Sequence, residues 1–157
     1  MNEKVQRYIR ELFSNDPEVM ANPTCYIYDL AEISERIREI QRYKLANVSL
    51  YYAMKANPNL TVLEHVLAHD EIAGIEIASI GELEKVRKAG LKEDSRVLFT
   101  GPGKTPKELE EAVRSKIRFI NVESVVEAIR INEIAKRLNI AKVNILIRVN
   151  INYYLDG

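Results

Sequence analysis

The sequence is poor in several features that would by themselves indicate a class of protein. It has one cysteine, Cys25, which cannot form an intramolecular disulfide. Its 23 lysines and arginines equal its 23 aspartates and glutamates, so no overall charge favours nucleic acid or an acidic membrane surface. No apolar run approaches the length of a membrane span, and residues 1–7 are too charged for a signal peptide. We therefore expect a cytoplasmic protein that binds neither nucleic acid nor membranes.

What is present fits one globular domain. The 157 residues are 46% hydrophobic and 29% charged, which is ordinary for a soluble chain that buries one core. Residues 2–13 carry apolar side chains at helical spacing and predict a helix. Residues 14–24 contain an Asp-Pro and an Asn-Pro pair and predict a loop. Residues 25–28 predict a short strand, in which Cys25 would be packed.

From residue 29 onward, a strand, a helix-capping residue and a helix recur. The predicted strands are residues 48–54, 74–78, 96–100, 118–122 and 143–149, and the predicted helices are residues 60–68, 81–88, 106–113 and 125–138. Four pairs have the spacing of a capping box: Asp29 with Glu32, Ser79 with Glu82, Thr105 with Glu108, and Ser124 with Glu127. Gly90 is predicted to end the second of these helices. The alternation predicts a parallel sheet with helical crossovers, either an open doubly wound sheet or part of a barrel.

The stretch that carries chemistry is residues 48–59. It begins as a strand and ends at Asn57-Pro58, where Asn can cap a helix and Pro fits its first position. Lys55 is predicted to be the last residue of the strand, with the small Ala53 two residues below it on the same face. This places an amine over the open end of the sheet, with room beside it for a flat ring. Burial disfavours the charged form of an amine, and a neutral amine can form a Schiff base with a carbonyl.

Residues 51–59, Tyr-Tyr-Ala-Met-Lys-Ala-Asn-Pro-Asn, resemble the signature of the fold-type III pyridoxal-phosphate decarboxylases, the diaminopimelate, ornithine and arginine decarboxylase family. Further stretches match that family in order: residues 23–30, 76–83, 99–105, 121–124 and 148–150. The resemblance implies an α/β fold, the (β/α)8 TIM barrel of the alanine racemase/decarboxylase type. A β domain follows this barrel, and the strand at residues 25–28 would belong to it.

A full barrel needs about 250 residues, so we expect only about the first five barrel strands and an incomplete barrel. The implied layout is an N-terminal helix and loop in residues 1–24, then the entry strand and the N-terminal part of the pyridoxal-phosphate-binding barrel in residues 25–157. The C-terminal β domain would be absent. We expect a fragment, or one piece of an assembly that another chain segment completes, and the resemblance implies a homodimer.

The resemblance also implies a function, the pyridoxal 5'-phosphate-dependent decarboxylation of an amino acid. The substrate would be free or carrier-bound, and the motifs are closest to the diaminopimelate branch. Lys55 would carry the cofactor as a Schiff base, with Ala53 beside it. Glu76 stands where family members often have Asp near the cofactor ring, and Arg148 would also lie near the ring. A pairing of Arg148 with Glu76 across the barrel mouth is predicted.

Other interpretations stay open. A truncated relative would bind a partner through its unclosed sheet edge without catalysis. Residues 101–105, Gly-Pro-Gly-Lys-Thr, resemble a nucleotide-binding phosphate loop, although Leu98 stands where that motif needs Gly. His65 and His69 have the spacing of zinc ligands on one helix, but no third ligand is evident and we expect no metal. Racemases and cofactor carriers that share the barrel differ in the residues around the lysine.

Overall fold

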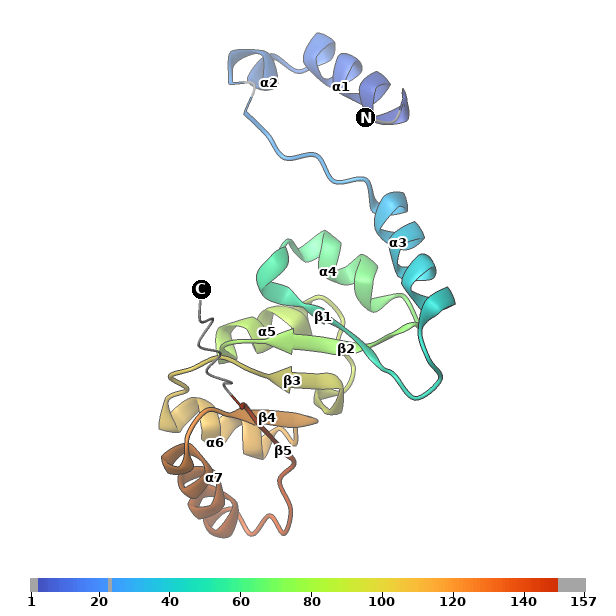
Figure 1. Ribbon diagram of the computed structural model, residues 1–157. Coiled ribbons are helices and arrows are strands. Elements are labelled where there is room, and N and C mark those ends of the chain that lie inside the picture. Colours follow the sequence, from blue (N-terminus) through green and yellow to red (C-terminus); the bar gives the residue numbers. More distant parts are fainter. Residues whose placement is uncertain (1–2, 23, 150–157) are drawn as a thin grey trace, which may run out of the picture.

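The computed structural model describes residues 3–22 and 24–149 and contains one parallel sheet (Figure 1). Its strands are β1 (Leu50–Ala53), β2 (Ile72–Ile77), β3 (Val97–Phe99), β4 (Phe119–Val122) and β5 (Ile145–Ile147). Each strand pairs with the next one along the chain, so the order is β1-β2-β3-β4-β5. A doubly wound sheet reverses its strand order at a switch point, whereas a barrel adds strands in sequence. The observed order is that of a barrel wall.

One face of the sheet is covered by helices and forms the core. The covering helices are α4 (Leu60–Leu67), α5 (Ile80–Lys88), α6 (Pro106–Arg114) and α7 (Val125–Arg137). Fully buried strand residues on this face, such as Ile75, Val97 and Phe99, pack against helix residues such as Leu83 and Leu109. Burial of each such side chain contributes roughly 1.5–3 kcal/mol. The core therefore fixes which face of every strand points away from the helices.

Three of these helices begin where the sequence predicts caps, whereas α4 is capped by Asn59 and not by the predicted Asn57. The side chains of Asn59, Ser79, Thr105 and Ser124 each accept a backbone N–H from the first turn of the following helix. Thr105 and Glu108 form the complete capping box, with Pro106 at the first helical position. Gly90 ends α5 with φ +94°, a left-handed conformation that glycine adopts without steric cost. These local signals explain why the helix predictions are correct to within one or two residues.

Four of the five strands are shorter than predicted, whereas β2 begins two residues earlier than predicted. The shorter β1 changes the setting of Lys55. The chain leaves β1 at Ala53 and turns through the 3-10 helix η1 (Met54–Ala56), so Lys55 follows the strand instead of ending it. Residues 143–149 contain only the three-residue β5. A second 3-10 helix, η2 (Asp94–Arg96), precedes β3.

The N-terminal region differs most from the prediction. It forms α1 (Glu3–Asn15), α2 (Pro17–Ala21) and α3 (Leu30–Tyr43). The short α2 lies in the predicted loop, and Asp16 caps it with Pro17 at its first position. The predicted strand at residues 25–28 is wrong: these residues have no strand assignment, and Cys25 is exposed, not packed. In Figure 1 this segment connects α2 to α3 outside the sheet, where no described strand lies beside it to complete a ladder.

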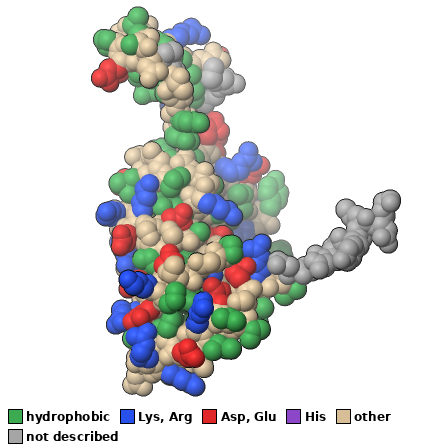
Figure 2. Space-filling model, turned by 90° about the vertical axis from the view of Figure 1, so that its left-hand side faces the viewer, with side chains coloured by type: hydrophobic (Ala, Val, Ile, Leu, Met, Phe, Trp, Pro, Cys, Tyr) green, Lys and Arg blue, Asp and Glu red, His purple; other side chains and the backbone are tan. Residues whose placement is uncertain are grey.

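The surface carries both signs of charge. Figure 2 shows Lys and Arg side chains intermingled with Asp and Glu over the face in view. Among the helices that the structure describes, none is long and apolar enough to cross a membrane. Asn2, Pro23 and Asn150, which belong to predicted features, lie outside the described residues.

Candidate functional site

The strand register places the predicted site residues on the face that the helices leave open. Ala53 pairs with Glu76, and Glu76 pairs with Leu98. Paired residues of neighbouring parallel strands point to the same side of the sheet. Their neighbours in sequence, such as Ile75 and Ile77, are buried under the helices, whereas Ala53 and Glu76 are only half-buried. This open face would be the interior of the barrel.

Lys55 lies beyond the carboxyl end of β1, at the edge of the sheet where barrel enzymes carry their active sites. In the η1 turn, Met54 is fully buried and Lys55 is exposed, so the turn directs successive side chains into and away from the core. This corrects the sequence-based expectation that the Lys55 amine is buried. The Tyr52 hydroxyl donates to the Asn57 carbonyl at 3.1 Å and holds the loop after the lysine. Burial first, and then Tyr28, raise the pKa of Tyr52, so this phenol stays protonated as a donor.

Glu76 and Arg148 do not pair with each other, which corrects the predicted contact. A Glu76 carboxylate oxygen accepts a hydrogen bond from the Thr100 hydroxyl at 2.9 Å. Arg148 Nη1 lies 3.4 Å from Glu123 Oε2. The reason is strand distance: β2 and β5 are separated by β3 and β4, a span of roughly 14 Å in a flat sheet, while Glu123 directly follows the neighbouring β4. Both predicted residues still lie at the same end of the sheet as Lys55.

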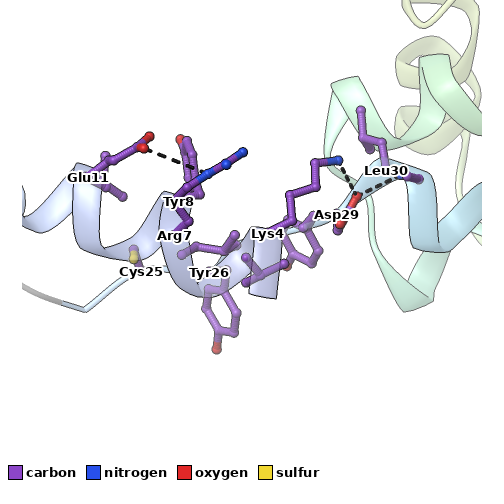
Figure 3. Close-up of a pocket in the computed structure, with 13 residues that line it drawn as sticks. Lys4, Arg7, Tyr8, Glu11, Cys25, Tyr26, Asp29 and Leu30 are labelled. Carbon is purple, nitrogen blue, oxygen red and sulfur yellow. Dashed lines mark hydrogen bonds and ion pairs between the residues drawn. The ribbon is translucent and has the colours of Figure 1, made fainter. Parts of the chain in front are cut away.

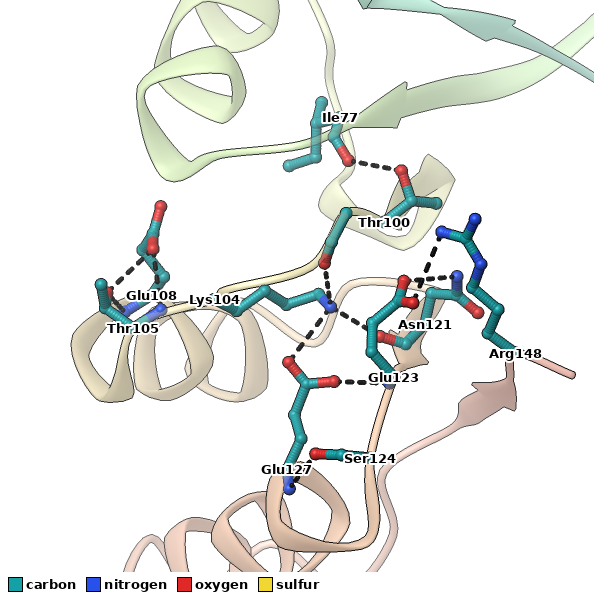
Figure 4. Close-up of polar contacts among 11 residues, drawn as sticks. Ile77, Thr100, Lys104, Thr105, Glu108, Asn121, Glu123, Ser124, Glu127 and Arg148 are labelled. Atoms are coloured by element: carbon teal, nitrogen blue, oxygen red, sulfur yellow. Dashed lines mark hydrogen bonds and ion pairs between the residues drawn. The ribbon is translucent and has the colours of Figure 1, made fainter. Parts of the chain in front are cut away.

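A buried ion pair that the sequence did not predict lies beside these residues (Figure 4). The Lys104 side chain is 1% exposed and its Nζ lies 3.2 Å from Glu127 Oε1. Nζ also donates to the carbonyls of Gly101 at 2.8 Å and Asn121 at 2.6 Å. All three protons of the ammonium group are therefore used inside the protein. This arrangement gives Lys104 a structural role in place of the phosphate contact that a nucleotide-binding loop would need.

The histidine pair is also engaged internally. Ser34 Oγ, on α3, lies 2.8 Å from His65 Nε2 and 2.9 Å from His69 Nε2, both on or next to α4. His69 Nδ1 is 3.5 Å from Glu71 Oε2. The contacts join α3 to α4, and the described part of the chain contains no group of three or more His, Cys, Asp or Glu arranged to hold a metal ion.

A groove of about 580 Å³ lies apart from this chemistry, between α1 and residues 25–31 (Figure 3). Lys4 Nζ lies 3.9 Å from Asp29 Oδ1 along its wall, and Asp29 also caps α3 through the Ala31 N–H. Its lining includes Tyr8 and Tyr26 but not Lys55, Glu76 or Arg148. The carboxyl end of the sheet, which carries the lysine and the charged residues, is therefore the stronger candidate site.

Comparison with known proteins finds similarity over most of the chain. Residues 30–154 match the family described as pyridoxal-dependent decarboxylase, pyridoxal binding domain. Diaminopimelate decarboxylase of Campylobacter jejuni is 39% identical over 132 residues, covering 83% of this chain and 32% of that protein. A Staphylococcus aureus decarboxylase of a 2-hydroxybutanedioate derivative is 36% identical over 135 residues, covering 85% of this chain and 32% of that protein.

The fold agrees with a solved relative. The crystal structure of Helicobacter pylori diaminopimelate decarboxylase complexed with L-lysine matches with a TM-score of 0.73 at 38% identity, covering 87% of this chain and 34% of that chain. This confirms the prediction of the N-terminal part of a TIM barrel. The chain spans about a third of the length of the relatives it matches.

Proposed function

The chain belongs to the pyridoxal-dependent decarboxylase family, by its pyridoxal-binding domain, and we propose that it supplies the cofactor lysine of an amino acid decarboxylase. The cofactor would be pyridoxal 5'-phosphate and the lysine Lys55. The observation that carries the proposal is the position of Lys55: it is exposed just beyond the carboxyl end of β1, beside the sheet face that no described helix covers.

The residues present fit this cofactor. Lys55 offers a primary amine, the group that condenses with an aldehyde. Ala53 has a small side chain on the open face and leaves space for a flat ring, and Glu76 lies beside it in register. Arg148 brings a cation to the same end of the sheet. Opposite charges around the site suit a ligand that carries a phosphate and a ring nitrogen.

When bound, pyridoxal phosphate supplies an electron-accepting ring that stabilises the charge left on an α-carbon as carbon dioxide departs. The chain's own residues would hold and orient that chemistry. Lys55 would hold the cofactor covalently, and the small side chain of Ala53 would leave room for its ring. Glu76, held by Thr100, and Arg148, held by Glu123, would set the charge around it.

The substrate would be an α-amino acid, free or carrier-bound, because the relatives named above are decarboxylases of amino acids or of a related acid. A homodimer, or completion by another chain segment, is proposed because β1 and β5 each pair on one side only among the described strands. The predicted division into residues 1–24 and 25–157 is retained as part of this proposal. We also infer a cytoplasmic location, supported by the exposed free thiol of Cys25.

The test of the proposal is cofactor attachment to one lysine. Purified protein titrated with pyridoxal phosphate is expected to show the visible absorbance band of lysine-bound pyridoxal, and Lys55→Ala is expected to abolish it. Lys92→Ala is the matched control, since Lys92 is exposed and lies away from the carboxyl ends of the strands. Borohydride reduction followed by peptide mapping is expected to place the label on Lys55. A band that persists in Lys55→Ala, or a label spread over other lysines, would contradict the proposal. Amino-acid-dependent release of carbon dioxide then tests turnover.

A further inference from the structure

Stability alone does not explain the buried Lys104–Glu127 ion pair. Both side chains are nearly inaccessible, at 1% and 9% exposure. Removing two charges from water costs free energy that their attraction does not reliably recover, and a buried apolar pair is often as stable. Lys104 also lies 5.5 Å from the centroid of the Phe99 ring, within the core. The contacts of the pair with the surrounding backbone therefore matter more than its own net stability.

What the pair orients is the chain that follows β4. Glu127 uses one carboxylate oxygen for Lys104, and the other accepts the backbone N–H of Glu123 at 2.8 Å. Lys104 holds the carbonyl of Asn121 in the same segment. The two charged groups thus fix the backbone on both sides of Val122, where β4 ends (Figure 4).

The fixed segment presents Glu123 to Arg148. Glu123 Oε1 accepts from Asn121 Nδ2 at 3.3 Å, and its Oε2 faces Arg148 Nη1 at 3.4 Å. The Glu123 side chain is 17% exposed, whereas that of Arg148 is 50% exposed. A half-exposed arginine samples many rotamers, and a fixed carboxylate beside it restricts them. The contacts therefore run without a break from the buried Lys104 to the guanidinium at the open end of the sheet.

We propose that Glu123, held by the Lys104–Glu127 pair, is a positioning residue that orients Arg148 toward bound pyridoxal phosphate. The inference rests on the proposed function, because the cofactor site is the place where the orientation of Arg148 matters. Lys104 suits this role as a compact cation with three donors, which it distributes over Gly101, Asn121 and Glu127. Glu123 acts through Arg148 and does not itself contact the cofactor.

The experiment is a double-mutant cycle on cofactor affinity. Glu123→Gln keeps a side chain of the same shape but removes the charge that faces Arg148. It is expected to weaken pyridoxal phosphate binding by about three- to tenfold, read from the visible-band titration. In an Arg148→Met background the same change is expected to have no further effect, since its only route to the cofactor is gone. A purely structural role would weaken binding equally in both backgrounds, and that result would overturn the proposal.

A second pair of variants tests the buried anchor. Lys104→Met/Glu127→Leu removes both charges together and avoids an unpaired buried ion, but it leaves the Glu123 N–H without its acceptor. Amide hydrogen exchange at Glu123 is expected to accelerate about tenfold or more, with a loss of affinity similar to that of Glu123→Gln. Lys104→Met/Glu127→Gln restores an acceptor oxygen for this N–H and is expected to slow its exchange again, while affinity recovers only in part because the Lys104 donor to the Asn121 carbonyl is still missing. Val113→Ala, a core truncation on α6, controls for lowered stability and is expected to leave affinity unchanged.

Failure of this inference is distinguishable from failure of the proposed function. If the parent protein binds no cofactor through Lys55, the proposed function falls and this inference falls with it. If the parent binds through Lys55 but Glu123→Gln has parental affinity, only the positioning role is overturned. Slow exchange of the Glu123 amide in the Met/Leu variant would overturn the anchoring step.

Discussion

Two glutamates that share one sequence pattern are used differently. Glu108 and Glu127 each stand three residues after a helix cap, Thr105 and Ser124 respectively. Glu108 completes its capping box and also accepts the N–H of Ile80 from the neighbouring helix. Glu127 instead points its carboxylate into the core, toward Lys104. Burial separates the two: the first glutamate stabilises a helix start, while the second anchors a strand end.

The Glu108 carboxylate predicts a pH dependence of stability. Its hydrogen bond from the Thr105 N–H, with further bonds from the Thr105 hydroxyl and the Ile80 N–H, holds the pKa of Glu108 below its ordinary value of 4.5. Because the folded-state pKa is the lower one, the ionised form stabilises the fold above pH 4.5, and this contribution is lost as the pH falls toward the folded-state pKa.

Glu108→Gln is therefore expected to lower the free energy of unfolding by about 1 kcal/mol at pH 7. Between pH 5 and pH 3 the difference between parent and variant is expected to shrink, as urea unfolding at several pH values would measure. Glu84→Gln, on an exposed position of α5, provides the comparison for a generic loss of one carboxylate. A constant difference across this pH range would show that ionisation of Glu108 does not contribute.

At the scale of elements, the approach of β2 to the chain before β3 depends on the absence of one side chain. A Cβ placed at Gly74 would lie 1.8 Å from the backbone oxygen of Arg96 and 2.8 Å from Tyr51 Cε1. The Arg96 guanidinium in turn donates to the carbonyls of Ile72 and Ala73. Gly74 thus allows η2 to pack against β2, and this contact sets the register in which β3 begins to pair with β2.

Gly74→Ala is expected to destabilise the protein by about 1–3 kcal/mol, because a backbone carbonyl cannot move aside as a flexible side-chain end can. The measurement is the midpoint of urea unfolding. Gly81→Ala is the matched control: its added Cβ would meet only Ser79 Oγ at 3.8 Å, and alanine favours a helix. Equal midpoints for the Gly74 variant and the parent would mean that β2 and β3 shift apart without cost.

The elements also show which features a sequence can predict. Helix starts and buried strands have local signals, so the cap at Thr105 is predicted correctly and the strand at residues 118–122 to within one residue. The α2 helix was missed although Asp16-Pro17 is a start signal of the same kind. The strand at residues 25–28 was predicted wrongly because a strand also requires a partner, which local sequence does not supply.

In the site, too, local features are predictable from the sequence and contacts between distant residues are not. One contiguous motif predicts Lys55 at the carboxyl end of the first strand, although the strand ends two residues earlier, and the comparisons confirm the family that the motif indicates. The predicted pairing of Arg148 with Glu76 is wrong, and the partner of Lys104 was not predicted, because these contacts are set by strand order and not by spacing. Lys104 and Glu127 lie 23 residues apart in the sequence, and Arg148 meets Glu123 only because β5 pairs with β4.

The whole molecule has two unequal faces. Helices bury one face of the sheet, while Leu98 and Phe119 on the other remain half-buried. At β5 the helix-side face of the sheet is also uncovered: Ile147, which pairs with the buried Val122, is 74% exposed. Exposed apolar side chains on a strand that pairs on one side only, as β5 does among the described strands, favour association with another chain. This edge is the observation that favours the alternative role in partner binding, and it is compatible with completion of the barrel by further segments.

The 157-residue chain is therefore expected to self-associate, and Ile147→Lys is expected to weaken the association about tenfold, the effect of losing one buried apolar side chain and placing a charge on the edge. Sedimentation velocity over a concentration series measures the change. Tyr43→Lys adds the same charge at a position that is 81% exposed on α3, away from the β5 edge. If both variants weaken association equally, net charge accounts for the effect; if only Ile147→Lys does, the chains meet along β5.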